Sequence, residues 1–189
     1  MLVIHPCTPS TVEIYPQCFH LPFKVAIDSR SRAVRFRVLH RYLATNMFLH
    51  KIGLVTSPLC SFCKQENWWI SEHLFINCVF SSTFWQSFIS FCNGIEIRLN
   101  ELSDVDKIFG ICENSTDFLM LNHLIILAKQ HIHSCSSRDC VPSLNIYLSK
   151  VAFTYHIETI IADSNGKRSF RDAKWKKYVQ NNKPGSRIT

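Results

Sequence analysis

Four potential metal ligands lie close together in the chain: Cys60, Cys63, His73 and Cys78. Their spacing is C-x2-C-x9-H-x4-C. A C-x2-C pair lets two thiolates on a tight turn hold one ion, and a later His and Cys can complete the tetrahedron that zinc prefers. Because protein groups fill all four positions and leave none for a water, the pattern indicates a structural Zn²⁺ rather than a catalytic one.

The alternative for these residues is a set of buried, unpaired thiols beside a hydrogen-bonded histidine. A second group of possible ligands, His131, His133, Cys135 and Cys140, follows further along. On a helix His131 and Cys135 share a face, which allows metal binding, but the spacing matches no established zinc pattern. The role of this second group stays open.

Composition favours one ordered domain with a polyanionic partner. The chain has 189 residues, 47% of them hydrophobic and 12% aromatic, with only five Gly, which suits a single packed core. A formal charge of +7 and a pI near 9.0 favour RNA, DNA or an acidic surface as the partner.

Cysteine usage and hydropathy indicate the compartment. Nine cysteines are an odd number, which disfavours a secreted disulfide framework. The first residues lack the pattern of a signal peptide, and no apolar run has the length of roughly 20 residues that a membrane span requires. We therefore expect an intracellular protein, nuclear or cytoplasmic, without a membrane partner.

Helical periodicity predicts the elements that position the ligands. We expect helices over about 28–43, 46–52, 82–91, 116–132 and 142–161, with His73 on a further short helix and an extended strand over 54–58. On the first helix, Phe36, Leu39 and Leu43 form the expected apolar face, opposite a stripe of Arg30, Arg37 and Arg41. The stretch 92–116 has no clear pattern.

These elements predict a mainly α fold: a small helical domain with a CCHC zinc-binding loop and a basic C-terminal tail. The expected divisions are an extended lead-in over residues 1–27, a zinc-binding domain over 28–92, a helical extension over 93–164 and the basic tail over 165–189. The lead-in is assigned from its four prolines, and the tail from its abrupt change to Lys and Arg.

Several short segments together resemble the zinc-binding segment that follows the polymerase in LINE-type (non-LTR) retrotransposon reverse transcriptases. They are Phe36-Arg-Val-Leu-His-Arg41, Thr45-Asn46, Leu49-His-Lys-Ile-Gly53, Leu59-Cys60-Ser-Phe-Cys63, Glu72-His73-Leu74-Phe75, Cys78 and Phe84-Trp85. Leu127-Ala-Lys-Gln130, Glu158 and Lys174-Trp175 look like the C-terminal extension of the same proteins. The loop between Cys63 and His73, with Trp68-Trp69, departs from the usual form by about a residue.

The resemblance implies a Zn²⁺ held by Cys60, Cys63, His73 and Cys78, and a role in holding template RNA or target DNA. The parent family is an RNA-directed DNA polymerase, but polymerase chemistry needs a carboxylate cluster for magnesium. No aspartate pair stands in a strand-turn-strand context, and Asp104 and Asp106 alternate in a weakly patterned stretch. The sequence therefore predicts a non-enzymatic fragment, decayed copy or captured domain of the element.

The predicted function is non-catalytic zinc-dependent binding of nucleic acid through phosphate contacts. The residues expected to bind nucleic acid are Arg30, Arg37, Arg41, Lys167, Arg168, Arg171, Lys174, Trp175, Lys176 and Lys177. Trp175 has an equal alternative role, which is to pin the tail to the core. Two alternative functions stay open: a protein interaction module that docks on the reverse transcriptase of the parent element or on a host factor, and a non-functional remnant.

Overall fold

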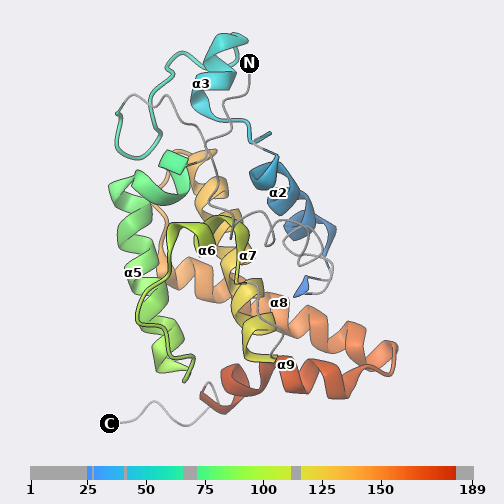
Figure 1. Ribbon diagram of the computed structural model, residues 1–189. Helices are drawn as coiled ribbons and strands as arrows, with labels where there is room; N and C mark the ends of the chain where they lie inside the picture. Colours follow the sequence, from blue (N-terminus) through green and yellow to red (C-terminus); the bar gives the residue numbers. More distant parts are fainter. Residues whose placement is uncertain (1–24, 27, 41, 66–71, 112–115, 182–189) are drawn as a thin grey trace, which may run out of the picture.

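A long central helix, α7 (Thr116–Ser136), organises the molecule (Figure 1). The computed structural model describes residues 25–181 except 27, 41, 66–71 and 112–115. Within those residues the regular elements are all helical: α2 (Ser29–Leu39), α3 (Asn46–Lys51), η1 (His73–Asn77), α5 (Val79–Gly94), α6 (Asp104–Phe109), α7, α8 (Leu144–Ser164) and α9 (Arg168–Asn181). The mainly α fold is confirmed.

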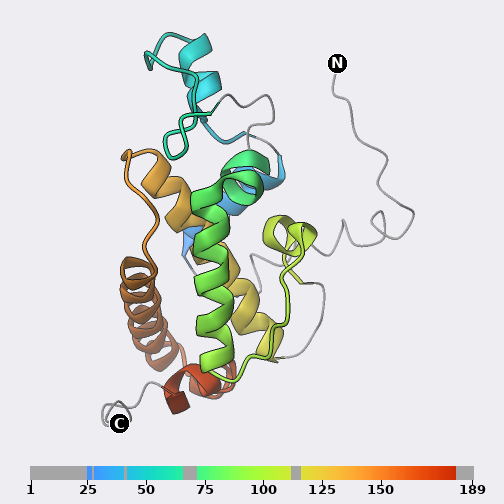
Figure 2. The same cartoon turned by 90° about the vertical axis from the view of Figure 1, so that its left-hand side faces the viewer.

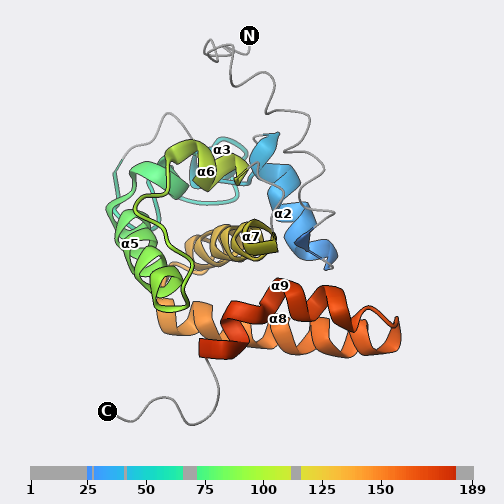
Figure 3. The same cartoon turned by 60° about the horizontal axis from the view of Figure 1, so that its bottom comes forward.

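Neighbouring helices surround α7 on several sides. It contacts α2, α8, α9 and η1, and Figure 3 shows it nearly end-on between α2, α5 and the α8–α9 pair. Its residues from Met120 to Lys129 are all buried. A helix that is apolar around most of its circumference is stable only when other elements cover it. The same core includes Phe75 and Trp85 from the zinc-binding part and Tyr147 and Val151 from the helical extension, so the predicted boundary at residue 92 crosses one shared core.

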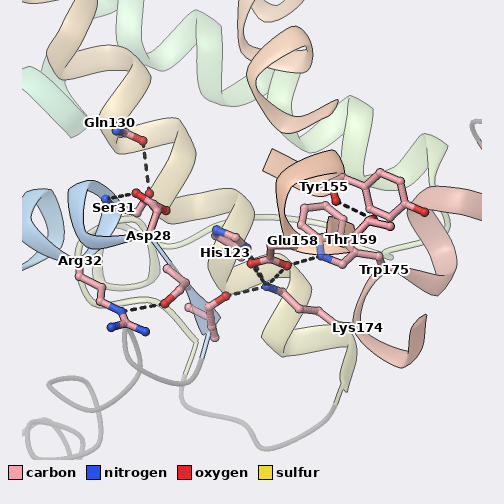
Figure 4. A network of polar contacts seen from close by, with 12 residues as sticks. Asp28, Ser31, Arg32, His123, Gln130, Tyr155, Glu158, Thr159, Lys174 and Trp175 are labelled. Carbon is pink, nitrogen blue, oxygen red and sulfur yellow. Dashed lines mark hydrogen bonds and ion pairs between the residues drawn. The ribbon is translucent and has the colours of Figure 1, made fainter. Parts of the chain in front are cut away.

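The predicted basic tail is largely a helix, which corrects the sequence interpretation. Residues of α9 pack on α7 and α8, and both Lys174 and Trp175 are buried. The Lys174 ammonium donates to both carboxylate oxygens of Glu158, at 3.0 and 2.9 Å, and to the carbonyl of Val25 at 2.6 Å. Trp175 Nε1 donates to the same carboxylate at 2.6 Å. Figure 4 shows these groups converging with His123 of α7.

The buried face of α2 also differs from the prediction. Ser31, Val34, Arg35 and Val38 point into the core, whereas Phe36 is 54% exposed. The reason is a buried cation: the Arg35 guanidinium donates to the carbonyls of Ile108 and Phe109 at the end of α6. Hydrophobic periodicity assigns every arginine to the solvent-exposed face of a helix. It therefore predicts the wrong buried face for a helix such as α2, whose Arg caps the end of a neighbouring helix.

Smaller differences concern the segments around the metal ligands. Residues 54–56 form bends and residues 57 and 58 are irregular, so the expected strand over 54–58 is wrong. The unpatterned stretch contains α6, which begins with a capping box in which Ser103 and Asp106 exchange hydrogen bonds. Asp104 pairs with Lys107, so both carboxylates serve the helix. Trp68 and Trp69 lie outside the described residues.

Candidate metal centre

The first two ligands sit on a tight turn between α3 and η1. The amide of Lys64 donates to the Cys60 carbonyl at 3.0 Å, and the amide of Cys60 donates to the Gln65 carbonyl at 3.0 Å. Lys64 adopts a left-handed backbone conformation with φ of 57°, which reverses the chain directly after Cys63. Two thiols three residues apart on such a turn face the same point, as a C-x2-C pair requires.

The other two ligands lie at the ends of one π-helical turn. Within η1, the amide of Cys78 donates to the carbonyl of His73 at 2.8 Å, five residues back. In an α-helix, residues five apart point about 140° away from each other. The wider π turn instead returns Cys78 to the side of the chain that carries His73. This local geometry explains how an H-x4-C spacing serves one ion.

The four side chains converge with dimensions that suit zinc. One ligand atom from each of Cys60, Cys63, His73 and Cys78 lies within 4.8 Å of all the others. Cys60 Sγ is 4.0 Å from Cys78 Sγ, and Cys63 Sγ is 3.3 Å from His73 Nε2. A tetrahedral ion with bonds of about 2.3 Å to sulfur separates two sulfurs by about 3.8 Å. The donor set of three thiols and an imidazole is one that zinc prefers.

Burial disfavours charge on these ligands unless a cation is present. Desolvation raises the pKa of the Cys60 thiol to about 12, and the neighbouring Cys78 adds to that increase. Burial also lowers the pKa of His73, which keeps the imidazole in the neutral form that binds metals. A bound divalent cation would favour the thiolates and offset their desolvation.

A known protein family matches the segment that carries the four ligands. Residues 10–85 match the family model described as zinc-binding in reverse transcriptase. The matched segment contains all four ligands, together with α2, α3, η1 and the first part of α5. No curated protein and no solved structure matches the chain.

Hydrogen bonds from side chains other than the four ligands hold the backbone around the ligands in place. The Asn46 side-chain amide donates to the Leu59 carbonyl at 2.7 Å and to Ser61 Oγ at 2.9 Å. Ser81 Oγ donates to the Leu74 carbonyl at 2.6 Å, and Trp85 Nε1 donates to the Phe75 carbonyl at 2.7 Å. The Asn46 bonds therefore support the turn that carries Cys60, and the Ser81 and Trp85 bonds support η1.

The C-terminal end of α7 connects this segment to the rest of the core. Ser136 Oγ lies 3.5 Å from Ser61 Oγ, and the exposed Lys64 pairs with Asp139 at 3.0 Å. Phe62 is buried and meets Phe80 of α5 edge-on, with ring centroids 6.4 Å apart. The metal-binding turn is therefore packed against two long helices rather than projecting from them.

The second group of Cys and His residues does not gather into a metal-ligand cluster among the described residues. Burial and the nearby Lys150 lower the pKa of His131 to about 4, and its ring nitrogens lie 3.0 Å from the Ser143 carbonyl and 3.1 Å from Lys150 Nζ. Cys135 is buried beside it, while Cys140 is exposed. Among the described residues, only the first set of four brings three or more such ligand atoms together.

The structure separates the residues predicted to bind nucleic acid into three groups. Arg30, Arg37, Lys167, Arg168 and Lys176 are exposed, although Arg168 pairs with Asp163 at 2.5 Å. Arg171 and Lys177 are half-buried, and they contact Tyr155 and the Glu96 carbonyl respectively. Lys174 and Trp175 are buried in the Glu158 network, so their expected contacts with nucleic acid are wrong. Arg41 lies outside the described residues.

Sequence reasoning missed the aromatic side chains that accompany the exposed arginines. Tyr42 is 73% exposed, and its ring is nearly parallel to that of His40, at 14° with centroids 6.2 Å apart. His40 in turn contacts the exposed Phe36, with centroids 4.2 Å apart. The alternation of these rings with Arg37 in the sequence was a usable signal, because cations interleaved with aromatics are typical of surfaces that bind nucleic acid.

Proposed function

We propose that this chain is a non-catalytic, zinc-stabilised nucleic-acid-binding segment related to LINE-type retrotransposon reverse transcriptases. The observation that carries the proposal is the convergence of Cys60, Cys63, His73 and Cys78 to within 4.8 Å, inside a segment that matches the reverse transcriptase zinc-binding family. The ion would fix the turn after Cys60 and the π turn at His73. It supplies folding energy rather than a reactive water, because the protein occupies every ligand position.

The surface that best suits nucleic acid lies on α2 and the turn that follows it. Arg30 and Arg37 are exposed and seven residues apart, so they lie on one helix face about 10 Å from each other. The exposed rings of Phe36 and Tyr42 accompany them. Cations that neutralise phosphates beside rings that stack on bases form the usual surface for single strands. Lys167, Arg168 and Lys176 would add weaker phosphate contacts on α9.

This surface supports a role in holding template RNA or a single-stranded end of target DNA beside the reverse transcriptase of the parent element. Phosphate contacts and stacking carry little sequence information. We therefore expect weak sequence preference, a strong dependence on salt, and tighter binding of single strands than of duplexes.

Fluorescence anisotropy on protein of measured zinc content tests the proposal. Labelled RNA, single-stranded DNA and duplex DNA of equal length are titrated across a salt series. Arg37→Gln should weaken binding of all strands and reduce the slope of log affinity against log salt by about one. Phe36→Ala should weaken single-strand binding by about tenfold, as the loss of one stacked base predicts.

The matched control is Arg98→Gln, which removes one exposed cation from the segment that follows α5. It should leave the salt slope nearly unchanged. Equal slopes for the wild type, Arg37→Gln and Arg98→Gln would contradict binding through α2. Duplex binding as tight as single-strand binding would contradict the stacking role of Phe36.

A second candidate function is docking on another protein, and the exposed apolar side chains around α3 favour it. Phe48 and Ile52 are both 50% exposed and Leu54 is 70% exposed. A partner such as the polymerase or a host factor would cover them and leave binding insensitive to salt. Recovery of that partner in a pull-down after nuclease treatment, and its loss with Phe48→Ser, would favour this function. Failure to detect a translated product in cells would favour a non-functional remnant.

A further inference from the structure

A stripe of large apolar side chains runs along the outward face of α8, far from the metal centre in sequence. Ile146, Phe153 and Ile160 are 56%, 67% and 50% exposed, and Ile157 is 37% exposed. At about 100° per residue, these four side chains fall within a sector of about 60°. Scattered exposed apolar residues need no explanation, but a continuous stripe along a whole helix marks an interaction surface.

The helix itself is held firmly in the molecule by its opposite face. Tyr147 and Val151 are buried in the core, and α8 contacts α5, α7 and α9. Figures 2 and 3 place α8 at the periphery, with its neighbours on one side only. The stripe is therefore displayed by a rigid, 21-residue helix rather than by a loop.

Charge distinguishes this face from the rest of a strongly basic protein. The formal charge is +7, yet no exposed residue of α8 is Lys or Arg. The remaining exposed positions are Asn145, Ser149, Ala152, His156, Asp163 and Ser164. The one Lys of α8, Lys150, is half-buried and contacts His131, and Asp163 pairs with Arg168. Such a face suits an uncharged protein surface and does not suit a polyanion.

The spacing of the stripe is symmetric about Phe153. Ile146 lies seven residues before it and Ile160 lies seven residues after it. If two copies of α8 pack antiparallel about a two-fold axis at Phe153, Ile146 of each copy meets Ile160 of the other. The same axis sets Ile157 against Ser149, a small residue that leaves room for it. An interface in which one patch contacts itself is the usual arrangement in symmetric dimers.

We propose that the α8 stripe binds a second copy of this chain, forming an antiparallel two-fold helix pair centred on Phe153. The seven-residue repeat suits helix-on-helix packing, and the absence of exposed cations on α8 removes the repulsion that two basic proteins would otherwise feel. Burying four such side chains on each copy covers on the order of 1,000 Å² in total, near the lower limit for a specific interface. The dimer is accordingly weak and depends on protein concentration.

Sedimentation velocity over a wide concentration range tests this inference on the full zinc-loaded chain. The wild type should shift from monomer to dimer as its concentration rises from about 1 μM to about 1 mM. Phe153→Asp should remain monomeric, because it places two carboxylates against each other at the axis. Leu54→Asp is the matched control: its side chain is 70% exposed near the zinc segment, and it should dimerise like the wild type.

A charge-reversal pair tests the orientation. Ile146→Lys alone and Ile160→Glu alone should both weaken the dimer at least tenfold. The double variant should recover it, because each new Lys meets a Glu of the other copy only in the antiparallel arrangement. Circular dichroism checks that every variant keeps its helices, so that loss of the dimer is not loss of folding.

A wild type that stays monomeric at every concentration would overturn the proposal and leave the stripe to a different protein. A dimer that survives Phe153→Asp would also overturn it, since the interface would then lie elsewhere. A double variant that fails to recover while Phe153→Asp abolishes the dimer would overturn the antiparallel pairing about Phe153.

Discussion

The candidate metal centre and the network around Lys174 balance their charge in opposite ways. The cluster of Cys60, Cys63, His73 and Cys78 brings together four candidate metal ligands with no Asp, Glu, Lys or Arg among them. The network around Lys174 brings a buried ammonium to a buried carboxylate, Glu158, with the Trp175 indole and the His123 ring as further partners. The first centre needs an ion from outside, while the second is completed by the chain itself.

This difference separates the part of the fold that should depend on zinc from the part that should not. Without an ion the buried thiols stay protonated and lose the bonds that would hold the two turns together, so folding near Cys60 should depend on zinc concentration. The Lys174 network carries no such link, but it depends on every member, because a buried charge without its partner is costly. Zinc should therefore control one end of the molecule and leave the packing of α8 and α9 largely unaffected.

Removal of the metal should have the largest effect. Structural zinc contributes about 10–16 kcal/mol of apparent binding energy in small zinc domains. We expect chelation or Cys78→Ser to abolish amide protection in residues 59–65 and 73–78, measured by hydrogen exchange, while α8 keeps its protection. Cys140→Ser is the control, since this exposed thiol lies outside the cluster. Wild-type protein without one equivalent of zinc would refute the metal centre.

Loss of the Glu158 carboxylate should have the next largest effect. Glu158→Gln leaves the Lys174 ammonium buried without a counter-charge, and this should cost about 3–5 kcal/mol of unfolding free energy in urea titrations. Asp163→Asn removes an acid from the same helix, but its partner Arg168 is 69% exposed, so it should cost less than about 1 kcal/mol. Equal losses of unfolding free energy in the two variants would contradict a larger contribution from the buried pair than from the exposed one.

The double variant Glu158→Gln with Lys174→Met tests whether the two charges stabilise the protein as a pair. Removing both charges avoids the unpaired state, so the double variant should be less destabilised than the sum of the two single variants. Strict additivity would mean that the two side chains do not act as a pair.

The neutral state of His123 in this network should make the free energy of unfolding depend on pH. Burial and the adjacent Lys174 hold the pKa of His123 well below 6.5, so the folded protein keeps the ring neutral while the unfolded chain protonates it. The contribution of the neutral ring is therefore complete above pH 6.5 and declines as pH falls below that value, by up to about 1.4 kcal/mol per pH unit. The groups that face the ring are Lys174, Glu158 and the Trp175 indole.

Unfolding titrations at several pH values on the wild type and His123→Gln measure this term. Both proteins lose zinc ligation in acid, so the difference between them isolates His123. That difference in unfolding free energy should shift against the wild type below pH 6.5. A difference independent of pH would mean that His123 is not neutral in the folded protein.

The smallest predicted effect concerns support for the metal-binding turn. Asn46→Ala removes two hydrogen bonds to the turn that carries Cys60, and it should cost about 1–2 kcal/mol of stability and about tenfold in zinc affinity. Competition with a chromophoric chelator measures the affinity. Asn145→Ala, at an exposed position of α8, should change neither quantity.

The sequence singled out the four residues that converge in the structure, because their types and spacing form a recognisable pattern. It also predicted most helices, since α5, α7 and α8 carry apolar residues at helical spacing. It did not predict the π turn, because the pattern between His73 and Cys78 is the same for an α or a π turn. The hydrogen bond from Cys78 to His73 distinguishes the two.

Buried cations account for the main misassignments. Periodicity treats Lys and Arg as solvent-facing, but Arg35, Lys129 and Lys174 are buried. Lys129 donates to the Ile108 carbonyl at 2.6 Å, and Lys174 contacts Glu158. Their partners are far away in sequence, so no local pattern reveals them. The α9 helix was interpreted as a basic tail for this reason, and the assignment of Phe36 to the core failed in the same way.

The hydrogen bond between Lys174 and the carbonyl of Val25 joins two points 149 residues apart. A chain emerging from the ribosome cannot close this contact until α9 has been synthesised. Val25, although made early, must wait for α9 before its carbonyl gains this partner. Native contacts of such long sequence separation slow folding, so the face of α7 that packs on α9 should be covered late.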